Sequence, residues 1–394
     1  MKPIRIGIVA GEVSGDMLAA GLIRELKRRL PDVSFEGIAG PQMQAEGCVS
    51  LFPMDALTVM GFEAFDRVLR ILDIRRQLAR RFTQDPPDIF IGVDAPDFNL
   101  GLEQKLRAAG VCTVHYVSPT VWAWRRWRIH KIRRAVDHML TLFPFEENYY
   151  REHGVPVTFV GHPLADAIPL RQDQAGTRRK LQLPLDKTII ALLPGSRRGE
   201  LKRHADLFVE TARWLHARHP RIHFVAPFAT EQTMQAFEQA LARSAGSPLP
   251  ITVTLGNSRE AMAASDIVLC ASGTAALEAA LIGKPMVVTY RISWWSSLLI
   301  RPMLHVKFYS LPNHLAGHEL VPEYIQSDAT PENLGRAIDR LLANPHEAEA
   351  MSDDLKAMHR ALRRRADVRA AQAVIALLPA ETRRRSKTQR RGGE

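Results

Sequence analysis

Residues 271–278 (ASGTAALE) combine small side chains with groups suited to binding a phosphate and a ribose. They follow a short apolar run and open a helical pattern, so they fit a turn between a buried strand and a helix. Such a turn directs free backbone N–H groups and the positive end of the helix dipole at an anion. Ser272 and Thr274 add hydroxyl donors, and Gly273 lets a phosphate approach the backbone. Glu278, one turn into the helix, could accept both hydroxyls of a ribose. The alternative is an ordinary strand–helix connection whose turn is small only for packing.

A second turn of the same kind, residues 194–200 (PGSRRGE), follows the apolar run 188–193. It carries Arg197 and Arg198, and an arginine can bind a diphosphate through two parallel hydrogen bonds. Arg197 is therefore a candidate for neutralising the charge of a nucleotide. Alternatively, both arginines are ordinary surface charges.

Two carboxylates, Asp94 and Asp97, follow the apolar run 88–93 in the segment DAPDFN. Open α/β sheets keep their chemistry at the carboxyl ends of the strands, where these side chains are expected. Either carboxylate could act as a general base. Either could instead cap the helix that begins near Leu100, and Asp97 lies closest to that helix in the sequence.

These turns need a scaffold of alternating strands and helices, and the sequence shows that pattern in two halves. Apolar runs typical of buried strands occur at residues 4–10, 34–38, 88–93, 111–117, 138–143 and 157–160, and again at 188–193, 223–227, 251–254, 267–270 and 286–290. Helical patterns separate these runs, which predicts an α/β fold with doubly wound parallel sheets. A loop with Ser14, Gly15 and Asp16 follows the first strand, so it also belongs to a ligand-facing edge.

The predicted boundaries divide the chain into four parts. Residues 1–168 form a first α/β domain and residues 169–345 a second one, with a polar linker predicted at 171–179. Residues 346–380 are predicted to be helical. The basic segment 381–394 is predicted to be a disordered tail.

Composition points to a globular protein with an anionic partner. The formal net charge of +11 suits nucleic acid, an acidic membrane face or phosphorylated substrates. The three cysteines are scattered and lack CxxC spacing, which favours a reducing compartment without structural zinc. The sequence has no uncharged apolar run near the roughly 18–20 residues that span a bilayer, and acidic residues interrupt the N-terminal region too soon for a signal peptide.

Two segments combine apolar side chains with arginines. One helical face carries Phe62, Phe65, Leu69 and Leu72. Such a basic amphipathic helix can lie on an anionic membrane surface, or it can pack on its own sheet with a solvated basic back. The other segment, residues 117–134, interleaves three tryptophans with arginines and a lysine. This composition suits stacking on single-stranded nucleic acid, contact with lipid headgroups, or a partly buried aromatic cluster.

The residue patterns predict no metal site and no cofactor. The histidines show neither HExxH nor another ligand-spaced cluster, and no GxSxG nucleophile turn is present.

Six motifs, in this order along the chain, resemble those of the lipid A disaccharide synthase family. They are GEVSGD (11–16), GVDAPDFN (92–99), HYVSPTVWAWR (115–125), LLPGSR (192–197), ASGTAALE (271–278) and SLPN (310–313). The resemblance implies a glycosyltransferase-B fold, in which two Rossmann-like domains face each other across a cleft and C-terminal helices pack back on the first domain. It also implies transfer from UDP-2,3-diacylglucosamine to 2,3-diacylglucosamine 1-phosphate (lipid X), which gives UDP and the β(1–6)-linked disaccharide 1-phosphate of lipid A biosynthesis.

The resemblance assigns roles to the candidate residues. An α-linked donor and a β-linked product imply inversion, with Asp97 as the base and Asp94 as a supporting or alternative carboxylate. Arg197, Ser272, Gly273 and Thr274 would bind the diphosphate, Glu278 would hold the ribose, and Asn313 is a UDP-site residue without an assigned role. Ser14, Gly15 and Asp16 would line the acceptor side. The family further implies a cytoplasmic enzyme, peripheral on the inner membrane of a Gram-negative bacterium through the 62–72 helix, and a homodimer.

Two other functions remain as alternatives. A UDP-N-acetylglucosamine 2-epimerase would share the two-domain architecture but would convert a UDP-sugar without an acceptor. A basic nucleic-acid-binding protein would explain the charge, yet neither the paired phosphate turns nor Glu278, so no nucleic acid is expected as a partner.

Overall fold

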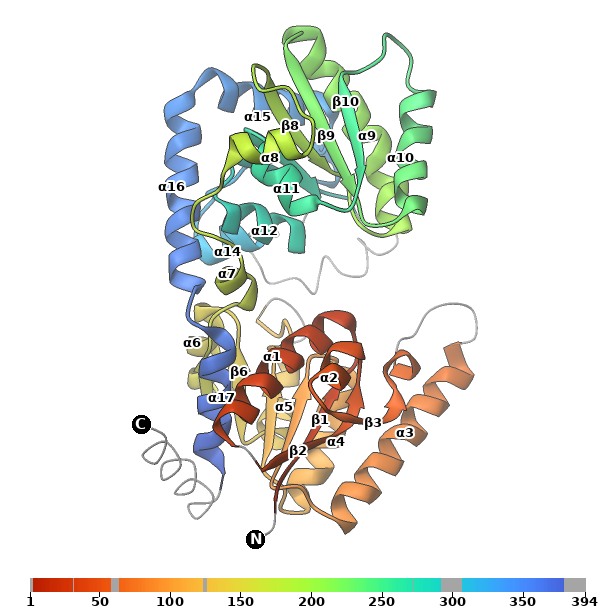
Figure 1. Cartoon of the computed structure of the whole chain (residues 1–394), viewed down its shortest axis with the longest axis vertical. Coiled ribbons are helices and arrows are strands. Elements are labelled where there is room, and N and C mark those ends of the chain that lie inside the picture. The colour runs from red at the N-terminus through yellow and green to blue at the C-terminus, as the bar shows by residue number, and fades with distance from the viewer. Residues whose placement is uncertain are drawn as a thin grey trace. The chain divides into compact units, whose positions relative to one another are not determined.

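The computed structural model of the chain describes residues 3–30, 32–57, 64–122, 126–271, 273–291 and 307–378, with no side-chain detail for 64–67. These residues divide into two compact units (Figure 1). Unit 1 contains the described residues of Met1–Asp166 and Leu362–Glu394, and unit 2 is Ala167–Ala361. The chain therefore leaves unit 1 after Asp166 and re-enters it at Leu362.

A parallel seven-stranded sheet forms the centre of unit 1. Its order is β3-β2-β1-β4-β5-β6-β7, with β1 Ile4–Ala10, β2 Val33–Ala39, β3 Val49–Pro53, β4 Ile89–Val93, β5 Thr113–Tyr116, β6 His138–Thr141 and β7 Val157–Phe159. Strand β4 is buried along its whole length, as expected for an apolar strand covered on both faces. The edge strand β3 was not expected from the sequence, because its residues are half-exposed and lack the continuous apolar run of the central strands.

Helices cover both faces of this sheet. They are α1 Val13–Arg29, α2 Pro41–Ala45, α3 Ala64–Gln84, α4 Pro96–Ala108, α5 Ile129–Ala135, α6 Pro144–Glu152 and α17 Ala366–Leu377, with short 3-10 turns η1 Met54–Leu57 and η2 Arg126–Arg128. The short helix α7 Pro163–Ala167 lies where the chain passes from unit 1 to unit 2. Helices α1 and α17 share one apolar core with the strands, whereas α3 and α4 share another. The predicted return of the C-terminal helices to the first domain is thus confirmed for α17.

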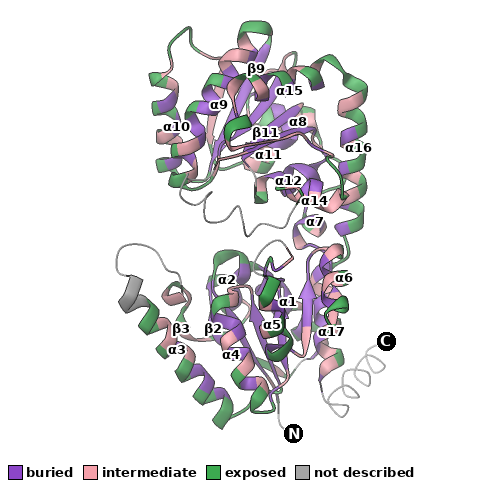
Figure 2. Cartoon of the chain, turned by 180° about the vertical axis from the view of Figure 1, so that it is seen from behind, coloured by how far each residue is buried: buried purple, intermediate pink, exposed green. Residues whose placement is uncertain are grey.

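Unit 2 repeats the design with a six-stranded parallel sheet of order β10-β9-β8-β11-β12-β13. The strands are β8 Thr188–Leu193, β9 Ile222–Phe228, β10 Ile251–Leu255, β11 Ile267–Ala271, β12 Met286–Tyr290 and β13 Glu323–Ile325. The helices are α8 Gln174–Lys180, α9 Arg198–Arg218, α10 Glu231–Arg243, α11 Ser258–Ala264, α12 Thr274–Ile282, α14 Leu311–Ala316, α15 Pro331–Ala343 and α16 Pro345–Leu362, with the 3-10 turn η4 Gln326–Asp328. Buried residues lie along the strands and on the inner faces of the helices (Figure 2).

The predicted linker at residues 171–179 is wrong, because helix α8 occupies most of it. Arg178 is buried there, and its guanidinium donates to both carboxylate oxygens of Asp266 at 2.8 and 2.9 Å and to the Ala264 carbonyl at 2.8 Å. These long-range contacts hold α8 in place, although its sequence has no apolar periodicity that would predict a packed helix. Among the described residues, no helix combines the length and apolar composition needed to cross a bilayer.

Candidate active site

Each sheet has one point at which the strand order reverses, and the candidate residues follow the strands on either side of it. In unit 1 the reversal lies between β1 and β4, and in unit 2 it lies between β8 and β11. Open α/β sheets bind ligands outside the carboxyl ends of the strands at such a switch point. Asp94 lies in the turn after β4 and Arg197 is the N-cap of α9 after β8, while Thr274 is the first residue of α12 after β11. The loop predicted for Ser14, Gly15 and Asp16 is wrong, because these residues form the start of α1 after β1.

The turn after β4 is held in an unusual backbone conformation. Asp94 and Ala95 have φ angles of 52° and 42°, so two consecutive non-glycine residues are left-handed. Such residues each cost on the order of 1–3 kcal/mol and persist only where surrounding contacts hold them. The buried Asn99 supplies one such contact, because its Nδ2 donates to the Asp94 carbonyl at 2.8 Å. The Asp94 N–H donates to the Tyr116 carbonyl of β5 at 2.8 Å.

Asp97 lies in the first turn of α4 and is not its N-cap, so the capping hypothesis is wrong. The N-cap position is Ala95, which has no side chain able to cap, and Pro96 starts the helix. The Asp97 side chain is 81% exposed and its Oδ1 accepts a hydrogen bond from Nη2 of Arg128. Arg75 Nη1 donates to the backbone carbonyl of Asp97 at 3.3 Å.

The loop after β1 lies directly against the turn after β4. A Cβ atom on Gly11 would stand 2.7 Å from Cβ of Ala95, and one on Gly15 would stand 3.4 Å from the Val93 carbonyl. Asp16 is buried, and its carboxylate accepts hydrogen bonds from the start of α2, from N of Gln42 at 2.9 Å and N of Met43 at 3.0 Å. Asp16 therefore holds α2 in place, while Ser14 remains exposed at the edge of the sheet.

In unit 2 the turn between β11 and α12 is open, as a phosphate site requires. Gly273 has φ 129°, and a Cβ at this position would have no neighbour within 4 Å. The α12 helix begins at Thr274, whose side chain is exposed.

The turn after β8 is shaped by Glu200, whose Oε2 accepts hydrogen bonds from the backbone of Ser196 at 2.9 Å and Arg197 at 3.2 Å. Arg197 precedes the 21-residue helix α9 and its side chain is exposed.

An arginine that the sequence did not indicate, Arg259, orients the side chain of Glu278. Its Oε1 accepts a hydrogen bond from Nε of Arg259 at 2.8 Å, and its side chain is 15% exposed. Arg259 comes from α11, the helix before β11, so only the fold brings the two together. One carboxylate oxygen of Glu278 is thus hydrogen-bonded to Arg259, which orients the carboxylate.

The side chain of Asn313 forms four hydrogen bonds within unit 2, and the residue is fully buried. Its Nδ2 donates to the Val321 carbonyl at 2.8 Å and to Oε1 of Glu323 at 2.7 Å, and its Oδ1 accepts from N of Leu320 and N of Val321, both at 2.7 Å. The donors and acceptors of an asparagine side chain are thereby used. Asn313 therefore ties α14 to the segment that leads into β13.

The chain is similar to known proteins over nearly its whole length. Residues 6–376 match the family model described as lipid-A-disaccharide synthetase. A lipid-A-disaccharide synthase of Hahella chejuensis is 50% identical over 378 residues, 96% of this chain and 95% of its own length. One of Pseudomonas aeruginosa is 49% identical over 376 residues, 95% of this chain and 98% of its own.

The chain belongs to the lipid-A-disaccharide synthetase family. Its relatives make it a glycosyltransferase of lipid A biosynthesis, so the alternative functions are not favoured.

Solved structures share the fold at low identity. A UDP-GlcNAc 2-epimerase from Neisseria meningitidis bound to UDP-GlcNAc aligns with a TM-score of 0.62 at 12% identity, covering 95% of this chain and 99% of that one. Acinetobacter baumannii MurG aligns with 0.57 at 15% identity, covering 96% and 99%.

The remaining predicted residues are placed as follows. Ser272 and Phe62 lie outside the described residues, as does Trp124, and no side chain is described for Phe65. Leu69 on α3 is 50% exposed and Leu72 is half-buried. Within the described ranges, no group of three or more His, Cys, Asp or Glu residues could hold a metal ion.

The sequence did not indicate the pairing of two buried polar groups beneath the unit 1 turns. Glu103 of α4 and His115 of β5 are both fully buried, with Oε1 and Nδ1 at 2.7 Å. Burial raises the pKa of Glu103. A Cβ on Gly92 would stand 2.1 Å from Glu103 Oε1, so glycine at this position leaves room for the pair. The motif GVDAPDFN contained Gly92, but nothing in the spacing indicated its partner.

A third buried carboxyl, Glu146, anchors the segment after β5. Its Oε1 accepts from Nε1 of Trp122 at 3.3 Å and its Oε2 from N of Phe143 at 3.1 Å. Burial raises the pKa of Glu146 to about 7. Trp122 is half-buried here while Trp127 is 60% exposed, so the described tryptophans of the aromatic segment are divided between core and surface.

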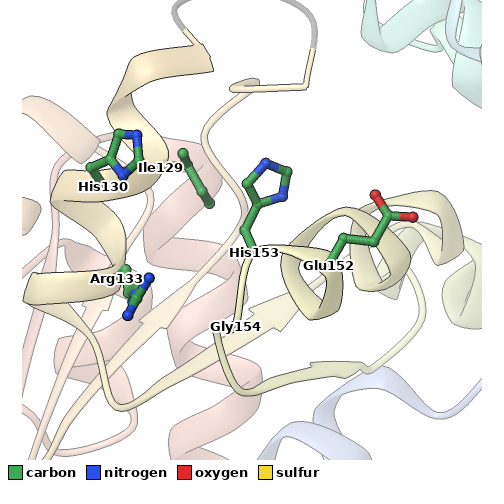
Figure 3. A pocket seen from close by; sticks show the side chains of 6 residues that line it. All are labelled: Ile129, His130, Arg133, Glu152, His153 and Gly154. Carbon is green, nitrogen blue, oxygen red and sulfur yellow. The ribbon is translucent and has the colours of Figure 1, made fainter.

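A pocket of about 430 Å³ in unit 1 is separate from these turns. It is lined by Ile129, His130, Arg133, Glu152, His153 and Gly154, from α5 and the end of α6 (Figure 3). His153 Nδ1 donates to the Tyr149 carbonyl at 2.7 Å, and the centroids of the two rings lie 4.5 Å apart with their planes tilted by 35°. None of the predicted site residues lines this pocket.

Proposed function

We propose that the chain transfers diacylglucosamine from UDP-2,3-diacylglucosamine to the 6-hydroxyl of 2,3-diacylglucosamine 1-phosphate, with inversion at the anomeric carbon. The products are UDP and the β(1–6)-linked disaccharide 1-phosphate. The observation that carries the proposal is that the predicted diphosphate and base residues sit at the switch points of their own sheets, in a chain of this family.

The donor is proposed to bind unit 2. Arg197 and the N-terminus of α12, with Ser272, Gly273 and Thr274, would hold the diphosphate, because a guanidinium and backbone N–H groups stabilise the charge that develops on departing UDP. Glu278, oriented by Arg259, would accept the ribose hydroxyls through its second oxygen. Asn313 supports this side by tying α14 to the segment that leads into β13.

The acceptor is proposed to bind unit 1, next to the exposed carboxylate of Asp97. Asp97 would take the proton of the 6-hydroxyl as the oxygen attacks the anomeric carbon. The new C–O bond forms as the bond to the β-phosphate breaks, and the electron pair leaves with UDP. Asp94 is the supporting carboxylate, Ser14 and Gly15 line the acceptor edge, and Asp16 holds that edge in position.

We further propose a peripheral position on the cytoplasmic face of the inner membrane. Both substrates carry acyl chains, and exposed Val68 and Leu69 stand on a helix rich in arginine. Apolar side chains with neighbouring cations bind anionic lipid surfaces. A homodimer is part of the same proposal, and light scattering of the purified protein would measure it.

The test is a mass-spectrometric product assay in detergent micelles, with the donor, with and without the acceptor, and with and without a chelator. We expect disaccharide and UDP only when acceptor is present, at a rate that the chelator leaves unchanged. Protein that binds UDP but makes no disaccharide would refute the acceptor assignment. Conversion of the UDP-sugar without acceptor would support an epimerase instead.

A further inference from the structure

Three cationic side chains from three different elements converge on the first turn of α4. Arg128 of η2 pairs with Oδ1 of Asp97, and Arg75 of α3 donates from Nη1 to the Asp97 carbonyl at 3.3 Å. The third is Lys131 of α5, which follows Arg128 by three residues. This convergence follows from packing, because α4 shares one apolar core with α3 and another with α5.

The charges of these groups also act on Lys131. Its pKa is lowered by burial and by repulsion from Arg75 and Arg128, and attraction to Asp97 and Glu103 opposes that shift. Of these two carboxyl groups, Glu103 is fully buried and engaged with His115, and Asp97 is exposed. Two arginines therefore contact Asp97, with Lys131 close to Arg128 in the sequence, and this surface carries more positive than negative side chains, which an anion would neutralise.

Gly101 makes room for this arrangement. It follows Asp97 by four residues on the same face of α4, and a Cβ at this position would stand 2.6 Å from Nη1 of Arg75. A glycine inside a helix is destabilising relative to alanine, because it loses more conformational freedom on folding. Helix α4 thus has a destabilising glycine at the position where the guanidinium of Arg75 contacts the helix.

We propose that Arg75, Arg128 and Lys131 bind the phosphate monoester of the acceptor substrate; this inference rests on the proposed function. Guanidinium groups bind phosphate oxygens through paired hydrogen bonds, and a lysine adds a point charge. The phosphate takes over the contact of Arg128, which releases Oδ1 of Asp97. The same cluster that recognises the acceptor then frees the carboxylate that receives its proton.

The experiment compares two acceptors that differ only in the phosphate: diacylglucosamine 1-phosphate and diacylglucosamine. The variants are Arg75→Gln and Lys131→Met, with Arg76→Gln as the matched control, since Arg76 is an exposed neighbour on α3. Each test variant is expected to lower kcat/KM for the phosphorylated acceptor by about 10-fold or more, as for loss of a hydrogen bond to a charged group. For the unphosphorylated acceptor the change should stay below about threefold, and the control should change neither.

Gly101→Ala provides a third test variant, which changes no charge. It should keep or raise the melting temperature, because alanine favours the helix, while it lowers the preference for the phosphorylated acceptor by displacing the end of Arg75. Equal losses for both acceptors in all three variants would overturn the inference and leave the transferase function standing.

Binding without donor separates the inference from the proposed function. If the wild type forms no disaccharide from either acceptor, the proposed function fails, and calorimetric binding of diacylglucosamine 1-phosphate in micelles still decides this point. Weaker binding by Lys131→Met than by Arg76→Gln would support the site, and equal binding would refute it. Variants that lose affinity only for phosphatidylglycerol vesicles, with an unchanged acceptor preference, would assign the cluster to lipid headgroups and overturn the proposal.

Discussion

Replacing Asn99 by alanine should release the strained turn that carries the proposed base. The variant removes the donor that holds the Asp94 carbonyl at 2.8 Å, beneath two consecutive left-handed residues. A lost hydrogen bond that leaves a partly buried carbonyl unpaired costs about 1–3 kcal/mol. In a domain of 150–250 residues each kcal/mol shifts the melting temperature by about 2–4 °C, so we expect the unit 1 transition to fall by several degrees.

Activity should suffer more than stability. A displacement of about 1 Å at a catalytic group can cost about 100-fold in rate, so kcat should fall by that order. The affinity for UDP should stay unchanged, because the proposed UDP site lies in unit 2. Calorimetry of UDP binding, differential scanning calorimetry and the product assay measure the three quantities on the same preparation.

A double variant separates the two roles of Asn99. Ala95→Gly lowers the cost of the positive φ angle, so it should restore part of the melting temperature of Asn99→Ala without restoring kcat. The reasoning fails if Asn99→Ala keeps kcat within threefold of the wild type. It also fails if UDP binding weakens in parallel with turnover, because that result would indicate general unfolding.

Four other perturbations follow from the same geometry. Asp97→Asn should lower turnover by about 10²–10⁴-fold and leave UDP binding intact, as calorimetry would show; unchanged turnover would remove it as the base. Arg259→Gln should weaken UDP binding several-fold but leave binding of 2′,3′-dideoxy-UDP unaffected, because Arg259 acts through Glu278. Glu146, whose pKa is raised to about 7, binds its proton more tightly in the folded than in the unfolded state, so the free energy of unfolding falls as pH rises from about 4.5 to 7. Chemical denaturation at pH 5 and 8 should show that Glu146→Gln has a higher stability relative to wild type at pH 8 than at pH 5. Leu69→Glu should reduce sedimentation with anionic vesicles while keeping turnover in micelles, and unchanged sedimentation would argue against this membrane contact.

The turns at the switch points could be predicted because local sequence encodes them. A run of buried apolar residues followed by small residues and a helical pattern is a short-range signal, and it located both β11 with α12 and β8 with α9. The order of the strands then brings these turns together in each sheet. The positions of Asp94, Arg197 and Thr274 at the sheet edges followed from that logic.

The contacts that hold the candidate residues could not be predicted in the same way. Asn99 looked like part of a motif, but its bond to the Asp94 carbonyl depends on a backbone conformation that neither aspartate nor alanine indicates. Arg259 lies 19 residues from Glu278, and nothing local links them. The capping hypothesis for Asp97 failed because Ala95 takes the N-cap position and Pro96 starts the helix one residue before it.

The division of unit 1 into two chain segments has a consequence for synthesis on the ribosome. Helix α17 contributes Ala370, Ala371 and Val374 to the core that α1 shares with the sheet, yet these residues are made after the whole of unit 2. Domains generally fold as units while the chain emerges, and a nascent unit 1 keeps an apolar face uncovered during that time. Unit 2, which is continuous, is able to complete its core first. The first sheet to be translated is therefore the last to have its apolar face covered. A ribosome that stalls before residue 366 leaves an incomplete product with an exposed apolar surface, which chaperones and proteases must remove.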